Sequence, residues 1–110
     1  MGSLNLRIVV FQEGDLWCAQ CVDYDIATQA KRITDLPYEI ARVLAGHIVI
    51  SAEQGLRPFE GLRPAPRRFA EMFEHSETRL ESLAPERIEF RLPKGVARIP
   101  APELRVAELV

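Results

Sequence analysis

Residues 4–31, LNLRIVVFQEGDLWCAQCVDYDIATQAK, decide the predicted fold of this chain. Within the segment 4–12, Leu4, Leu6, Ile8 and Val10 occupy every second position, a period that is typical of a strand. Val9 and Phe11 make the second face apolar as well, so we expect part of each face to be covered. The same reasoning predicts strands over 16–22 and 26–31. Gly14 separates the first two strands and can take the positive φ that a tight hairpin needs. Because the links are short, the sequence predicts a three-stranded antiparallel meander.

Residues 34–54 predict one long amphipathic helix. Thr34 is the expected N-cap, Pro37 is tolerated in the first turn, and Gly55 suits the position just after the last turn. A first apolar stripe has the spacing of a core face and consists of Leu36, Ile40, Val43, Leu44, His47 and Ile48.

A second apolar stripe lies beside the first on the same predicted helix. It consists of Ala41, Ala45, Val49 and Ala52, with Tyr38 at its edge. A small sheet cannot cover both stripes of one helix. We therefore expect this second stripe to contact the C-terminal half of the chain or to form an interface with a partner or with a second copy.

Proline and glycine interrupt the chain after this helix. Residues 56–66 are predicted to be an irregular connector, because they contain Pro58, Gly61, Pro64 and Pro66. Residues 67–92 are expected to hold a short helix followed by a probable strand. The strand is predicted over 87–92 by the alternation of Ile88, Phe90 and Leu92 with Glu89 and Arg91.

Residues 93–110 are expected to form an extended C-terminal arm, since Pro93, Gly95, Pro100 and Pro102 disfavour a long regular element. Its last residues, 103–110, suit a short helix, a strand or a frayed end. Together these elements predict a single α+β domain over 1–110. Its core is the meander and long helix of residues 4–55, with the second short helix and a fourth strand added from the C-terminal half.

Bulk composition excludes several classes of protein. The chain has 110 residues, of which 47% are hydrophobic and 27% charged, and its formal net charge is −2. This charge gives no overall attraction to nucleic acid or to an anionic membrane. No apolar run approaches the roughly 20 residues of a membrane-spanning helix, and the N-terminus lacks the features of a secretory signal. We therefore expect a cytoplasmic protein with reduced cysteines.

Cys18 and Cys21 have the C-x-x-C spacing of redox and zinc sites. Redox pairs open a helix, whereas this pair lies within a predicted strand. Residues three apart on a strand point to opposite faces, so these thiols are poorly placed to bridge each other or one metal. The sequence therefore predicts two structural thiols, no metal site and no cofactor.

Asp23 and Asp25 follow the second predicted strand, and Asp15 lies in the preceding hairpin. Clustered carboxylates can hold Mg²⁺ and support a metal-dependent nuclease, which is one alternative function. The favoured interpretation is turn chemistry, because Asp side chains readily hydrogen-bond to nearby backbone groups. We predict no catalytic residues.

A local basic patch forms the other alternative site. It consists of Arg57, Arg63, Arg67 and Arg68, beside Phe59 and Phe69. Arginines interleaved with aromatic residues can bind RNA or DNA. The nearby prolines and glutamates favour a docking surface for an acidic protein segment instead.

The first half of the chain resembles the HicB-like antitoxin family. The matching stretches are Leu6–Phe11, Trp17–Asp23, Ile26–Ala30 and the helix that starts at Thr34, so the resemblance covers about residues 4–55. Tyr24-Asp25-Ile26-Ala27 replaces the turn that is usual in the family, and no DNA-binding segment is evident after Gly55.

The resemblance implies a partial ribonuclease-H-like fold without the catalytic set of that nuclease. It also implies a protein that covers and neutralises a small messenger-RNA-cleaving toxin and that often dimerises. We therefore expect a non-catalytic protein-binding module that forms a homo-oligomer. Its partner would be a small basic toxin, unless the chain is an orphan relative of such antitoxins.

Overall fold

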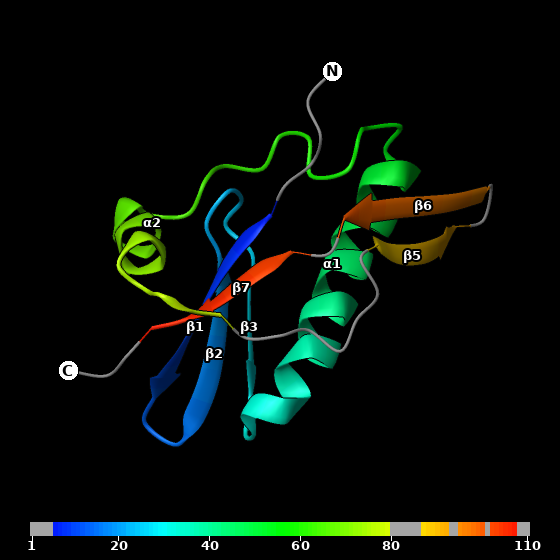
Figure 1. The fold of residues 1–110 in the computed structure, drawn as a ribbon. Helices are drawn as coiled ribbons and strands as arrows, with labels where there is room; N and C mark the ends of the chain where they lie inside the picture. Colours follow the sequence, from blue (N-terminus) through cyan, green and yellow to red (C-terminus); the bar gives the residue numbers. More distant parts are fainter. Residues whose placement is uncertain (1–5, 80–86, 93–94, 101, 108–110) are drawn as a thin grey trace.

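The computed structural model describes residues 6–79, 87–92, 95–100 and 102–107. Within these residues the chain forms two α-helices, a five-stranded mixed sheet and a separate two-stranded sheet (Figure 1). This confirms the predicted α+β class. The strand order of the larger sheet is β3-β2-β1-β7-β4.

The first three strands are consecutive antiparallel neighbours. They are β1 (Arg7–Glu13), β2 (Leu16–Cys21) and β3 (Ala27–Ala30). Gly14 has a φ of 60° in the β1–β2 turn, a conformation that glycine adopts without steric cost. β2 therefore has two partners, whereas β3 is left at one edge of the sheet.

The C-terminal segment is not the extended arm that the prolines indicated. It contains β6 (Gly95–Pro100) and β7 (Glu103–Val106), and β7 enters the sheet parallel to β1 with Ile8 opposite Leu104. The reason is burial, because Leu104 is only 4% exposed and belongs to the main core. The short strand β4 (Thr78–Arg79) pairs antiparallel with β7 and forms the other edge.

The strand predicted over 87–92 is β5 (Arg87–Leu92), but it does not join the larger sheet. It pairs antiparallel with β6 in a two-stranded sheet. β5 lies beside the long helix α1 (Leu36–Glu53), which this two-stranded sheet approaches from the side (Figure 1). One part of the C-terminal half thus lies against the predicted helix.

α1 begins later than the sequence indicated. Thr34 is not the N-cap, because it lies in a 3₁₀ turn, η1 (Ile33–Asp35), that precedes the helix. Asp35 is the N-cap residue and makes no side-chain capping hydrogen bond; its carboxylate instead accepts a hydrogen bond from Arg32 Nε at 3.2 Å. Local ion pairing therefore replaces the predicted Thr34 cap.

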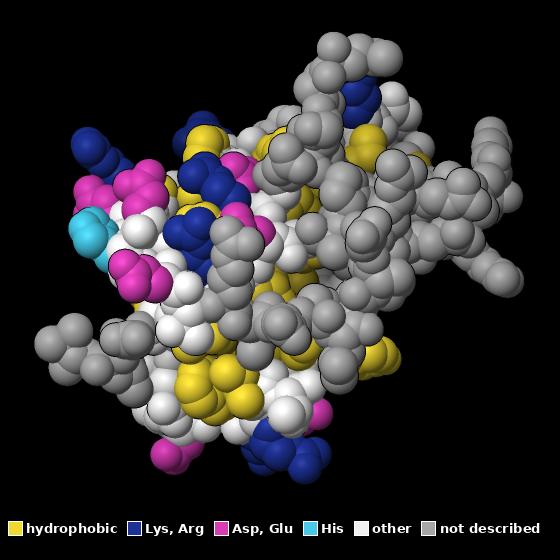
Figure 2. All heavy atoms as spheres, viewed as in Figure 1, with side chains coloured by type: hydrophobic (Ala, Val, Ile, Leu, Met, Phe, Trp, Pro, Cys, Tyr) yellow, Lys and Arg dark blue, Asp and Glu magenta, His cyan; other side chains and the backbone are white. Residues whose placement is uncertain are grey.

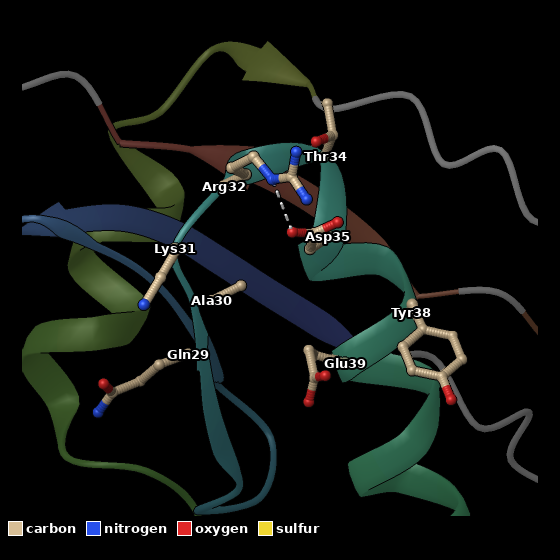
Figure 3. Close-up of a pocket in the computed structure, with 8 residues that line it drawn as sticks. All are labelled: Gln29, Ala30, Lys31, Arg32, Thr34, Asp35, Tyr38 and Glu39. Carbon is tan, nitrogen blue, oxygen red and sulfur yellow. Dashed lines mark hydrogen bonds and ion pairs between the residues drawn. The ribbon is translucent and has the colours of Figure 1, made fainter.

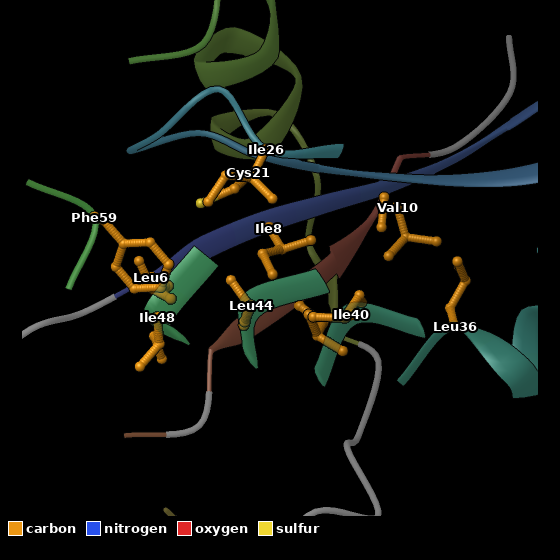
Figure 4. Close-up of a cluster of buried hydrophobic side chains, with 12 residues drawn as sticks. Leu6, Ile8, Val10, Cys21, Ile26, Leu36, Ile40, Leu44, Ile48 and Phe59 are labelled. Atoms are coloured by element: carbon orange, nitrogen blue, oxygen red, sulfur yellow. The ribbon is translucent and has the colours of Figure 1, made fainter. Parts of the chain in front are cut away.

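One face of α1 packs on the larger sheet and forms the main core (Figure 4). The buried helix residues are Leu36, Ile40, Leu44, Ile48 and Ser51. Val43 and His47, which the sequence placed in the same stripe, are half-buried at its border. The predicted core face is thus correct along its centre.

The second helix, α2 (Arg67–Glu74), covers the opposite face of the sheet, where it packs on β1. Its Phe69 and Phe73 form a smaller buried cluster with Val9 and Val22. The sheet is therefore covered on both faces, by α1 on one and α2 on the other. Within the described residues, none of the helices has both the length and the apolar character needed to cross a membrane.

Candidate functional site

The second stripe of α1 is only partly covered. Ala41, Ala45 and Val49 are half-buried, and Ala52 is exposed. Tyr38, at the start of the stripe, is 71% exposed, which is unusual for an aromatic side chain. The stripe therefore leaves apolar surface at both of its ends, and Tyr38 is its exposed aromatic member.

Tyr38 also lines a surface pocket of about 450 Å³ between β3 and the start of α1 (Figure 3). The lining residues are Gln29, Ala30, Lys31, Arg32, Thr34, Asp35, Tyr38 and Glu39. Figure 3 shows Ala30 directed toward the helix, whereas Gln29 and Lys31 point away from it. Of these residues, only Tyr38 was a candidate from the sequence, because the lining residues meet only when the chain turns from β3 into α1.

Most charges around this pocket are already paired. Arg32 Nε lies 3.2 Å from Asp35 Oδ2, and Arg42 Nη2 lies 2.8 Å from Glu39 Oε2. The hydrogen bond that Arg42 donates to Glu39, together with the negative charge of Glu39, raises the pKa of Arg42. Among the described residues, Lys31 is the cation of this pocket without an ion pair. The pocket therefore offers one available positive charge beside an exposed aromatic ring.

The arginines of the predicted basic patch are all exposed, but its aromatic residues are not. Phe59 is fully buried in the main core, and Phe69 is buried between α2 and the sheet. Neither ring is therefore on the surface with the arginines, although the guanidinium of Arg68 lies 4.7 Å from the centre of the Phe69 ring. Burial in the two cores outweighs the polar surroundings of both residues in the sequence.

The four arginines also do not form one compact cluster. Arg57 and Arg63 belong to the connector, which runs from the end of α1 to α2, whereas Arg67 and Arg68 lie on α2 (Figure 1). Over α2, basic and acidic side chains are interspersed (Figure 2). Arg67, for example, lies 3.4 Å from Glu71. An arrangement of mixed sign is poorly suited to tracking a phosphate backbone.

The two cysteines point to opposite faces of β2 and are both buried as free thiols. Cys21 belongs to the α1-side core and lies among aliphatic side chains (Figure 4). Burial raises the pKa of both thiols, and the charge of Glu13 raises the pKa of Cys18 further. A raised pKa disfavours the reactive thiolate, so this arrangement does not suit redox chemistry.

Two of the three carboxylates of the possible nuclease site, those of Asp23 and Asp25, have other partners. Asp23 accepts hydrogen bonds from the backbone N–H of Arg7 at 2.8 Å and from its guanidinium at 3.0 Å. Asp25 accepts one from Gln20 Nε2 at 3.1 Å. In the described part of the chain, no three His, Cys, Asp or Glu side chains are grouped so that they could hold a metal ion.

Comparisons with known proteins give no match: no family model, no curated protein and no solved structure is similar to this chain. The candidate site is therefore defined by its own geometry. It consists of the second stripe of α1, the pocket at the start of that helix, and the edge of β3 beside it.

Proposed function

We propose that this chain is a non-catalytic, HicB-like protein-binding module, either an antitoxin-type neutraliser of a small basic RNA-cleaving toxin or an orphan relative. The observation that carries the proposal is the exposure of Tyr38 at the end of a half-buried apolar stripe. Exposed aromatic residues that border apolar surface are typical of protein interfaces. The proposal includes self-association of the module in the cytoplasm.

The order of the elements supports the HicB-like part of the proposal. Three antiparallel strands are followed by a long helix, and a later strand lies parallel to the first. This order is compatible with the partial ribonuclease-H-like arrangement that the resemblance implies. The resemblance itself covers residues 4–55, whereas β7 comes from the other end of the chain.

The chemistry of the described residues supports binding to protein. Asp23 and Asp25 are held by Arg7 and Gln20, which favours a structural role for both. Burial of Phe59 and Phe69 removes the stacking surface that a single-stranded nucleic acid would use. A protein partner, by contrast, can use Tyr38 and the apolar stripe directly.

Site-specific crosslinking tests this proposal. Tyr38→p-benzoylphenylalanine places a photo-crosslinker on the site, and the same change at Arg68 provides a control on the other face of the sheet. The variants are co-expressed with the product of the adjacent gene. We expect a crosslink to that protein from position 38 and none from position 68. The purified chain should also inhibit RNA cleavage by that protein.

Two outcomes would contradict the proposal. One is the absence of any complex with the adjacent gene product together with no inhibition of cleavage. The other is tight RNA binding by the purified chain whose affinity falls steeply with salt, since this would indicate a phosphate-binding protein.

A further inference from the structure

Among the described residues, β3 has no partner strand on its outer side. The Cys21 N–H donates to the Ile26 carbonyl at 2.8 Å, and the β2–β3 register continues from this pair. Hydrogen-bonded and non-hydrogen-bonded pairs alternate along an antiparallel ladder. Thr28 and Ala30 therefore bond to β2, whereas the N–H and C=O groups of Ala27 and Gln29 point away from the sheet.

The connector covers this edge at the N-terminal end of β3. The Asp25 N–H donates to the Arg63 carbonyl at 2.7 Å, so residue 25 already has a backbone partner. The free edge therefore begins at Ala27 and continues through Gln29 toward Lys31. A strand added here has to pair with these three residues.

The edge carries opposite charges at its two ends. Ile26 and Ala30 belong to the α1-side core, so by alternation Asp25, Gln29 and Lys31 share the other face, where all three are exposed. An antiparallel strand with the same sequence would bring the basic end of one copy to the acidic end of the other. The edge is thus complementary in charge to a second copy of itself.

The position of α1 favours the same arrangement. The helix packs more closely on β3 than on any other described strand, so one of its sides lies over the sheet edge. That side carries Val43, Gly46 and Ile50, of which Ile50 is 53% exposed. The space beside Gly46 is open, and a residue without a side chain allows a second helix to approach closely.

From these observations we infer that a second copy of this chain pairs its β3 antiparallel with β3, around a twofold axis at Gln29. Ala27 then lies opposite Lys31 of the second copy, and that lysine is a diagonal neighbour of Asp25. The axis is perpendicular to the sheet, so both α1 helices lie on the same face of one continuous sheet. This inference rests on the self-association in the proposed function and locates its interface.

The test measures the mass of the full chain by light scattering over a range of concentrations. Gln29→Pro removes an outward-pointing N–H without removing a β2–β3 hydrogen bond, because proline is tolerated on an edge strand. We expect a dimer for the native chain and a rise of more than tenfold in the dissociation constant for Gln29→Pro. Circular dichroism and thermal unfolding confirm that the variant is folded.

Charge variants test the register. Lys31→Glu should weaken the dimer several-fold, because it places a second carboxylate diagonally across from Asp25. The double variant Asp25→Lys with Lys31→Glu should restore it. Arg67→Glu makes the same charge change on α2 and should leave the dimer unchanged. Ala52→Glu, in the second stripe of α1, should also leave it unchanged.

The possible results distinguish the β3–β3 interface from the proposed function as a protein-binding module. A dimer that survives Gln29→Pro but dissociates with Ala52→Glu would overturn the β3 interface and retain self-association through the α1 stripe. A monomer at every concentration would overturn both the interface and the self-association. The crosslinking experiment at Tyr38 would then still decide whether the module binds another protein.

Discussion

The ring of Phe59 stacks on the ring of Tyr24, with 5.1 Å between their centroids. Phe59 lies in the connector after α1, and Tyr24 lies in the link between β2 and β3. The contact closes one end of the main core, where Phe59 also lies close to Leu6 and Ile48 (Figure 4). A residue from a segment without regular structure thus completes the packing between sheet and helix.

Phe59 has a φ of 65°, a left-handed conformation that is unfavourable for a large side chain. We predict that Phe59→Ala lowers the free energy of unfolding by about 3–5 kcal/mol, because it removes a fully buried ring. Phe59→Gly removes the same ring but accepts the positive φ, and should be less destabilising by about 0.5–1 kcal/mol. Urea unfolding of the two variants measures this difference. A larger loss for glycine would contradict the role assigned to the backbone.

Leu104 tests the parallel pairing of β7 with β1. Leu104→Ala should lower the free energy of unfolding by about 2–5 kcal/mol, because the side chain lies in the core opposite Ile8. Leu16→Ala is the matched control, since Leu16 is 36% exposed and should lose much less. Equal effects in denaturant unfolding would argue against a buried β7.

Arg105 connects β7 to α2, and we predict that a lysine at this position lowers the stability of the fold. Its guanidinium donates to the carbonyls of Phe73 at 3.2 Å and Ser76 at 3.4 Å, and lies 4.3 Å from the centre of the Phe73 ring. Arg105→Lys should cost about 1–2 kcal/mol in unfolding free energy, because an ammonium group lacks the planar fork. Thermal unfolding of the variants measures this loss. Arg68 lies over the ring of Phe69 but is exposed, so Arg68→Lys is the control and should leave the unfolding free energy nearly unchanged.

Cys21 should make stability depend on alkaline pH. Burial raises the pKa of its thiol above the ordinary 9.0, so the folded state holds the proton more tightly than the unfolded chain. The stabilisation is fully present below the unfolded pKa and is lost as the pH rises through the folded pKa. We therefore expect the free energy of unfolding to fall above about pH 9. The fall should be smaller in Cys21→Ala, which retains Cys18. Parallel pH profiles for the two proteins would contradict this assignment.

Local pattern predicted the regular elements of the first half. The alternation along β1 and the spacing of Leu36, Ile40, Leu44 and Ile48 are set by the geometry of a strand and a helix. Residues at this spacing lie on the same face of the strand or helix whenever it forms. The spacing of nearby residues is therefore enough to predict which face is buried. The exception was Thr34, because an added 3₁₀ turn moved the start of the helix to Leu36.

The candidate site was only partly predictable, because a local pattern shows a helix face but not the contacts between distant elements. The second stripe of α1 was visible as a pattern, and Tyr38 was singled out at its edge. The pocket and the free edge of β3 were not visible, since they depend on where the chain turns and on which strands pair. The burial of Phe59 was not visible either, because this residue lies in the connector and belongs to no periodic element.

The order of residues along the chain was enough to predict β1 to β3, α1 and the face of α1 that meets the sheet. The place of β7 beside β1 and the closure of the core by Phe59 depend on tertiary packing. Periodicity shows which side of an element is buried, but it does not show which distant segment covers that side. That choice depends on the fit of side chains and on unpaired backbone groups, which exist only after the elements have come together.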